Sequence, residues 1–179
     1  MIRLTSAALV LTALAAAAAT LRPVQEMPQA TQQHAMLLKG VGEWEGTLTM
    51  FMPGAPEEGT PCRESVTAIG EFWTTSTFHC DLMGVPFVGT GVTGYDPDRK
   101  LFVGTWVDSM TTRLSVMEGT YDEARRALVM NYMGPDPMTG ELVPHRTETV
   151  HEGDGYTSTF FMGAGEGTKS MTIQMKRVK

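Results

Sequence analysis

Apolar and polar residues alternate in short runs from Trp44 to the end of the chain, and turn-forming residues separate the runs. A period of two places successive side chains on opposite faces of an extended strand. Clusters such as Asp96-Pro97-Asp98 and Gly153-Asp154-Gly155 are typical of tight connections between such strands. The expected strands are residues 43–52, 62–69, 72–82, 86–95, 101–108, 112–121, 127–133, 143–152, 156–162 and 169–178. About ten strands in succession predict an all-β antiparallel meander that closes into a barrel and leaves no exposed edge.

The first and last runs carry the clearest alternation. Trp44, Leu48 and Met50 share one face of the first run, and Arg177 falls on the apolar face of the last run, in line with Met171, Ile173 and Met175. An inward arginine needs an aromatic face or a carboxylate, so we expect Arg177 to stack on Trp44. The alternative is that Arg177 lies past the rim in solvent. Gly42-x-Trp44 at the start and an inward arginine at the end resemble the closing elements of lipocalin-type barrels, which implies a structural role for Gly42, Trp44 and Arg177.

The chain begins with a targeting pattern. A short positive segment, an apolar stretch and a small-residue tract ending at Ala19 predict a signal peptide over residues 1–19 and a periplasmic or secreted protein. The apolar stretch is too short for a membrane anchor, so we expect no membrane span after cleavage. Residues 20–28 are a predicted flexible linker, and residues 29–179 a single barrel domain. Within that domain, residues 29–39 favour a short helix that caps one end of the barrel.

Composition excludes some partners. The chain has 14 basic and 20 acidic residues, a net charge of −6, and no basic cluster. Electrostatic binding to nucleic acid or to anionic lipid is therefore not expected.

Cys62 and Cys80 are the two cysteines, and an exported protein can oxidise them. Opposed residues in a hairpin share a constant index sum, so pairing of these two positions centres the turn on Glu71. A two-residue turn at Gly70-Glu71 would instead place Cys62 opposite His79 and require a β-bulge for the bridge. A redox-active pair would be spaced as Cys-x-x-Cys, so we predict a structural disulfide.

Longer sequence segments show a more specific resemblance to a protein family. The segments HAMLLKGVGEWEG, GVPFVGTGVTGYDPDRKLFVGTWVDSM and DPMTGE are similar to the bacterial "domain of unknown function 1579" family, over nearly all of the chain after the leader. The resemblance implies a lipocalin-like, calycin-type barrel and no established activity.

Trp106 and Asp108 share one face of the run at 101–108. If that face points inward, Asp108 becomes a buried carboxylate beside an aromatic ring, able to act as an acid or to bind a polar ligand group. If the opposite face points inward, Asp108 caps the turn at residues 109–111. The turn-capping role is favoured for the carboxylate, and Trp106 is expected to be substantially buried either way.

The 14 methionines, Met50 among them, suit either irregular core filling, which is the default, or a pocket that adapts to apolar ligands. Strand alternation alone explains the Met50-x-Met52 spacing, so a copper(I) site is a minor alternative. The candidate pocket residues are Met50, Trp106, Asp108, Tyr132 and Arg146.

Histidines supply little further chemistry. His145 and His151 would lie roughly 20 Å apart along one strand, too far to share a metal ion. The sequence therefore predicts no metal and no cofactor, although a single histidine leaves noncovalent haem open.

The predicted function is binding of a small apolar or amphipathic molecule inside the barrel. Two alternatives remain: an enzyme with an inward polar set around Asp108, Arg146 or His145, and a structural or interaction barrel with a filled core. An enzyme is the less favoured of these readings because no catalytic motif is present. The state of the barrel interior would decide among the three.

Overall fold

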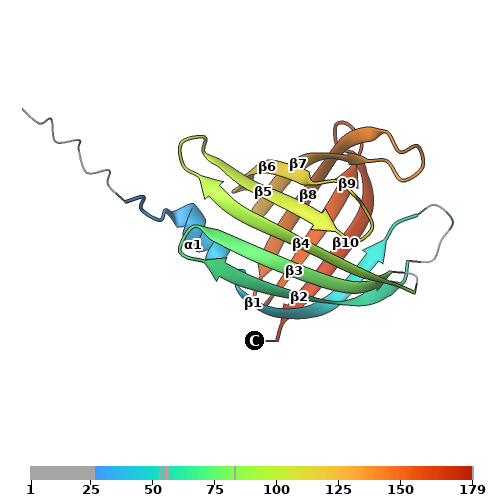
Figure 1. Cartoon of the computed structure of the whole chain (residues 1–179), viewed down its shortest axis with the longest axis horizontal. Helices are drawn as coiled ribbons and strands as arrows, with labels where there is room; N and C mark the ends of the chain where they lie inside the picture. Colours follow the sequence, from blue (N-terminus) through green and yellow to red (C-terminus); the bar gives the residue numbers. More distant parts are fainter. Residues whose placement is uncertain (1–26, 53, 55–56, 83, 179) are drawn as a thin grey trace, which may run out of the picture.

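The computed structural model describes residues 27–52, 54, 57–82 and 84–178 (Figure 1). The predicted leader and most of the predicted linker lie outside these residues. Within the described ranges the chain forms one helix and ten antiparallel strands, which confirms the predicted all-β barrel. The elements are α1 (Gln32–Leu38), β1 (Gly42–Met50), β2 (Gly59–Ile69), β3 (Trp73–Leu82), β4 (Val85–Asp96), β5 (Leu101–Asp108), β6 (Ser115–Asp122), β7 (Ala127–Pro135), β8 (Leu142–Glu152), β9 (Gly155–Met162) and β10 (Thr168–Arg177). In this part of the chain, no helix has the length and apolar character needed to cross a membrane.

The strands form a closed meander. Each strand pairs with the next along the chain, and β1 pairs with β10, so that Trp44 lies opposite Arg177. Closure satisfies the backbone hydrogen bonds of both terminal strands, which would otherwise be exposed edges. The connections β2–β3, β4–β5, β6–β7 and β8–β9 lie at the same end as the start of β1, which we name the α1 end (Figure 1). The opposite end is named the far end.

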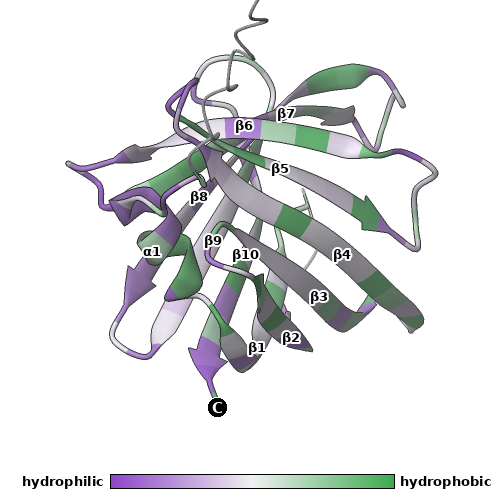
Figure 2. Ribbon diagram, turned by 60° about the vertical axis from the view of Figure 1, so that its left-hand side comes forward, coloured by the Kyte–Doolittle hydropathy of each residue, from purple (hydrophilic) through white to green (hydrophobic). Residues whose placement is uncertain are grey.

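The inner face follows the predicted alternation. Trp44 and Leu48 of β1 are buried, together with Phe78 of β3 and Ile173 and Met175 of β10. These side chains, with both cysteines, form a core on the β10–β1–β2–β3 side of the barrel. Figure 2 shows polar and apolar segments mixed along the strands, as expected when alternate residues face the core and solvent.

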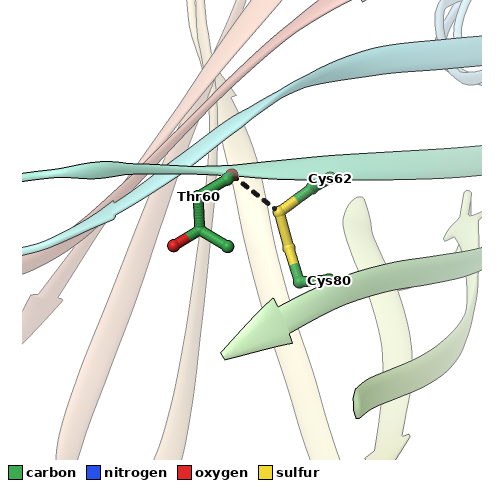
Figure 3. The surroundings of a disulfide bond; sticks show 3 residues. All are labelled: Thr60, Cys62 and Cys80. Atoms are coloured by element: carbon green, nitrogen blue, oxygen red, sulfur yellow. Dashed lines mark hydrogen bonds between the residues drawn. A yellow bond between two sulfur atoms is a disulfide. The ribbon is translucent and has the colours of Figure 1, made fainter. Parts of the chain in front are cut away.

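The disulfide joins neighbouring strands. Cys62 of β2 pairs directly with Cys80 of β3, with 4.5 Å between their Cα atoms (Figure 3). This short distance is typical of a non-hydrogen-bonded antiparallel pair, in which side chains approach most closely. The hairpin turns through residues 70–72, where Gly70 has a φ of 59°. The regular register is therefore confirmed, and the alternative with a two-residue turn and a bulge is wrong.

Helix α1 begins later than the predicted residue 29 because His34 fixes its start. Nδ1 of His34 accepts hydrogen bonds from the backbone N–H and the hydroxyl of Thr31, at 3.0 and 2.9 Å. The proton therefore sits on Nε2, which donates to the carbonyl oxygen of Tyr95 at 3.0 Å. His34 is buried, and its ring packs edge-on against Phe72 and Tyr95. This contact holds α1 against β3 and β4 at the α1 end (Figure 1).

Candidate functional site

Arg177 and Trp44 meet at the α1 end. The guanidinium carbon of Arg177 lies 4.2 Å from the centre of the Trp44 ring. Nη1 donates to the carbonyl oxygen of Val41, and Nη2 donates to that of Lys39 at 2.6 Å. Nε1 of Trp44 donates to the carbonyl oxygen of Gly40 at 2.9 Å. The segment after α1 is thus tied to the last strand at this end of the barrel.

Gly42 explains the first position of the Gly-x-Trp pattern. Its φ is 149°, in a region that side-chain-bearing residues rarely adopt. This conformation lets the chain turn from α1 into β1 and bring Trp44 inward two residues later.

Trp106 faces the interior. Its neighbours on the same face of β5, Phe102 and Gly104, are both buried, whereas Val107 on the other face is 41% exposed. The alternative in which Val103, Thr105 and Val107 face inward is therefore wrong. Trp106 is partly buried and packs against the core.

Two glycines of β4 make room for the Trp106 ring. A Cβ at Gly89 would lie 2.1 Å from Cζ2 of the indole, and one at Gly91 would lie 2.9 Å from Cε3. The indole therefore lies flat against the inner wall of β4, where larger residues would push it toward the barrel axis.

Asp108 faces inward and also caps the following turn, as favoured from the sequence. It lies on the inward face of β5, and its Oδ1 accepts the N–H groups of Met110 and Thr111 at 2.9 and 3.0 Å. The carboxylate thus caps the turn after β5 at the far end. Its charge also reaches Tyr132 of β7: burial chiefly, and then Asp108, raise the pKa of the Tyr132 phenol to about 12.

His145 of β8 stacks on Tyr132, with 5.0 Å between the ring centres. Burial lowers the pKa of His145, so its imidazole is neutral near pH 7. Asp108, Tyr132 and His145 therefore gather at the far end, and Met50 at the end of β1 packs against the core from there.

Arg146 does not join this group. It lies next to Thr147, which is buried and pairs with the buried Met130, so Arg146 occupies the opposite, outer face of β8. There its guanidinium lies 4.3 Å from the centre of the Phe161 ring and pairs with Glu148 at 2.9 Å. Arg146 therefore belongs to the outer wall, and the expectation of an inward Arg146 is corrected.

A polar cluster that the sequence did not indicate lies deeper in the barrel. Glu64 of β2 shares the inward face with Cys62 and pairs with Trp44 and Phe78 on the flanking strands. Its Oε1 accepts the hydroxyl of Ser76, and its Oε2 accepts the phenol of Tyr156 from β9. A signal was available: the predicted pairing of Cys62 with Cys80 places Glu64 opposite the apolar Phe78.

Two aromatic residues, Trp44 and His151, pack around Tyr156 of this cluster. The ring centres of Trp44 and Tyr156 are 5.1 Å apart, and His151 packs against both. Burial, and then the charge of Glu64, raise the pKa of the Tyr156 phenol far above its usual range. The phenol therefore stays protonated and donates to the carboxylate.

Two open grooves lie on the outer wall, with volumes of about 570 and 810 Å³. Both run past Glu45 and Gly46 of β1. Charged side chains of both signs line them, among them Glu45, Arg63, Asp81, Glu152 and Lys176. Such a lining is typical of a solvated surface, so the interior polar cluster remains the better candidate site.

The fold and its inward-facing groups define a closed antiparallel β-barrel protein. The family described as "Protein of unknown function (DUF1579)" matches residues 29–177, and the chain belongs to this family. The resemblance stated from the sequence is thereby confirmed.

Solved structures support the fold. The crystal structure of Rv2717c from M. tuberculosis is similar with a TM-score of 0.63 and 15% sequence identity, over 84% of this chain and 100% of that chain. At this identity the similarity concerns the fold alone. No curated protein matches the sequence.

Proposed function

We propose that the protein binds a small apolar or amphipathic molecule inside the barrel. The observation that carries this proposal is the partial exposure of inward-facing residues in the middle of strands. Glu64, Ser76, Gly91 and Trp106 all face inward, and none of them is fully buried. In a filled barrel such positions are packed out of contact with water.

The interior side chains suit an amphipathic ligand. Apolar and polarizable groups pack around the core on its inner side: Met50, Leu82, Phe87, Trp106, Phe160 and Met171. The carboxylate of Glu64 and the hydroxyls of Ser76 and Tyr156 offer a polar position beside them. Binding pockets for small molecules commonly combine an apolar lining with a few placed polar groups.

Trp44, Arg177 and α1 occupy the α1 end, so we propose that a ligand enters from the far end. Met50, Asp108, Tyr132 and His145 lie near that end. The flexible thioether of Met50 is suited to contact ligands of varied shape.

We also propose that the protein is exported. The composition of residues 1–19 supports a cleaved leader. The Cys62–Cys80 disulfide supports an oxidising compartment.

Fluorescence titration tests ligand binding. The neutral probe N-phenyl-1-naphthylamine is added to the protein lacking residues 1–19, and its emission is followed together with the tryptophan emission. We expect saturable binding with energy transfer from the tryptophans, and displacement of the probe by decanol. Trp106→Phe should weaken binding of the probe, because this indole lines the interior.

Trp73→Phe is the matched control, since Trp73 is 38% exposed and lies on the outer wall over Gly94. Native mass spectrometry of protein purified without denaturation would reveal any retained ligand. Absence of saturable probe binding, together with no retained molecule, would overturn the proposal.

A further inference from the structure

Glu64 places a carboxylate on the inner face of the barrel, between two buried aromatic residues. It pairs in register with Trp44 on one side and Phe78 on the other, and both of these neighbours are buried. A charge in such surroundings is costly unless hydrogen bonds or an opposite charge compensate it.

The known partners of Glu64 compensate it only in part. Ser76 and Tyr156 each donate one hydroxyl to a different carboxylate oxygen. Both donors are neutral: the serine hydroxyl carries no charge, and the raised pKa of Tyr156 keeps its phenol protonated. An ionised carboxylate has about four acceptor positions, so roughly two remain.

No basic side chain of the described residues forms an ion pair with Glu64; the ion pairs present join other residues. Arg177 of β10 and Glu64 of β2 are both paired with Trp44. Strand β1, which carries Trp44, therefore separates the two charged residues. The guanidinium of Arg177 is directed to the indole and to the carbonyl oxygens of Lys39 and Val41. Within the described part of the chain, the carboxylate of Glu64 therefore has no counterion.

The surroundings of Glu64 favour a cation rather than an anion. Phe78 flanks Glu64, and the rings of Trp44 and Tyr156 lie 5.1 Å apart beside it. A carboxylate without a counterion attracts an ammonium group and can accept charge-assisted hydrogen bonds from it. A ligand carboxylate would meet repulsion at the same place.

We infer that the ligand of this barrel carries a protonated amine, whose ammonium group binds Glu64 while its apolar part lies toward Trp106 and Met50. This inference rests on the proposed binding of a small molecule in the interior, and it specifies the chemical class of that molecule. Glu64 supplies the counter-charge, and Ser76 and Tyr156 hold the carboxylate in place.

Three matched probes test the inference by displacing N-phenyl-1-naphthylamine: decylamine, decanol and decanoate. Decylamine and decanoate are used below their micelle concentrations, and decanol below its solubility limit. They share an alkyl chain and differ in the charge of the head group at pH 7. We expect decylamine to bind roughly ten- to a hundredfold more tightly than decanol, as for a hydrogen bond to a charged group, and decanoate to bind most weakly.

Glu64→Gln keeps the size of the side chain and removes its charge. We expect decylamine to lose about tenfold or more in affinity in this variant, and decanol to change by less than about twofold. Glu43→Gln is the matched control, because Glu43 accepts the hydroxyl of Ser65 at 2.7 Å on the exposed, outer side of the same two strands. This control should retain the wild-type order of affinities.

The outcomes separate the two proposals. If decanol and the probe bind but decylamine binds no more tightly than decanol, Glu64 has only a structural role in the barrel. The amine inference is then wrong, and the proposed function stands. Persistence of the amine preference in Glu64→Gln would also refute it. If no probe binds the wild type, both proposals fail. Should Glu64→Gln not fold, the order of affinities in the wild type decides the question by itself.

Discussion

Replacing Arg177 with methionine should destabilise the barrel by an amount that the structure allows to be worked out. Methionine retains an apolar stem against Trp44 and removes the guanidinium. The stacked cation is worth about 1 kcal/mol at a half-buried position. Each of the two charge-assisted hydrogen bonds, to Lys39 and Val41, contributes about 1 kcal/mol after allowance for water at the rim. The expected loss is therefore about 2–3 kcal/mol, or a decrease in Tm of about 4–12 °C for a domain of this size.

Urea unfolding followed by near-ultraviolet circular dichroism measures this loss. Lys176→Met is the matched control, because Lys176 is the exposed neighbour of Arg177 on β10. That variant should remain within about 0.5 kcal/mol of the wild type, as is usual for a surface position. A similarly small effect for Arg177→Met would refute the idea that Arg177 closes the barrel, and would show that the stacking adds nothing to stability.

A second measurement on the same variant checks the geometry separately from the stability. Burial chiefly, and then the charge of Arg177, lower the pKa of His151. Arg177→Met should therefore raise the pKa of His151 partway toward 6.5, as followed by NMR titration of its ring protons. An unchanged pKa would contradict the placement of the guanidinium beside the Trp44–His151 pair.

Three further predictions concern other parts of the barrel. Gly89→Ala should displace the Trp106 ring and shift its fluorescence emission, because the new methyl group would overlap the indole. It should also lower the free energy of unfolding in urea by about 1–3 kcal/mol. An unshifted spectrum would contradict the placement of the indole against β4. Replacing both Cys62 and Cys80 with serine removes a link across 18 positions and should lower the unfolding free energy by about 3 kcal/mol, with dithiothreitol giving a similar loss in the wild type. Because the folded-state pKa of His151 lies below 6.5, the unfolded chain binds protons first on acidification. The free energy of unfolding should thus fall as the pH is lowered from 6.5 to the pKa of His151 in the folded protein. In urea melts at several pH values, His151→Gln should reduce this dependence of the unfolding free energy on pH.

The strands could be predicted because alternation and turn residues are local signals. Residues 101–108 were predicted and form β5 unchanged. The start of β6 was placed at residue 112, three positions early, because Thr111 to Ser115 have no clear alternation and the turn capped by Asp108 extends further. The start of α1 depended on the capping contact between His34 and Thr31, and helix propensity carries no information about that contact.

The interior site was less accessible to sequence reasoning. Glu64 meets Tyr156 only because the closed barrel brings together residues 92 positions apart. Arg146 was placed on the wrong face because the β8 segment alternates between polar types, so neither face is visibly apolar. The direction of these side chains depends on the neighbouring strands and could not be read from their own strands.

The pairing of β1 with β10 also has a consequence for how the barrel forms. Its two seam strands are the first and the last along the chain, and Trp44 can meet Arg177 only after all the intervening strands have been synthesised. Contacts this distant in sequence slow folding, and until they form both seam strands expose unpaired backbone. Loss of a few C-terminal residues would leave the nascent chain without its final seam, in an open sheet prone to associate with other chains.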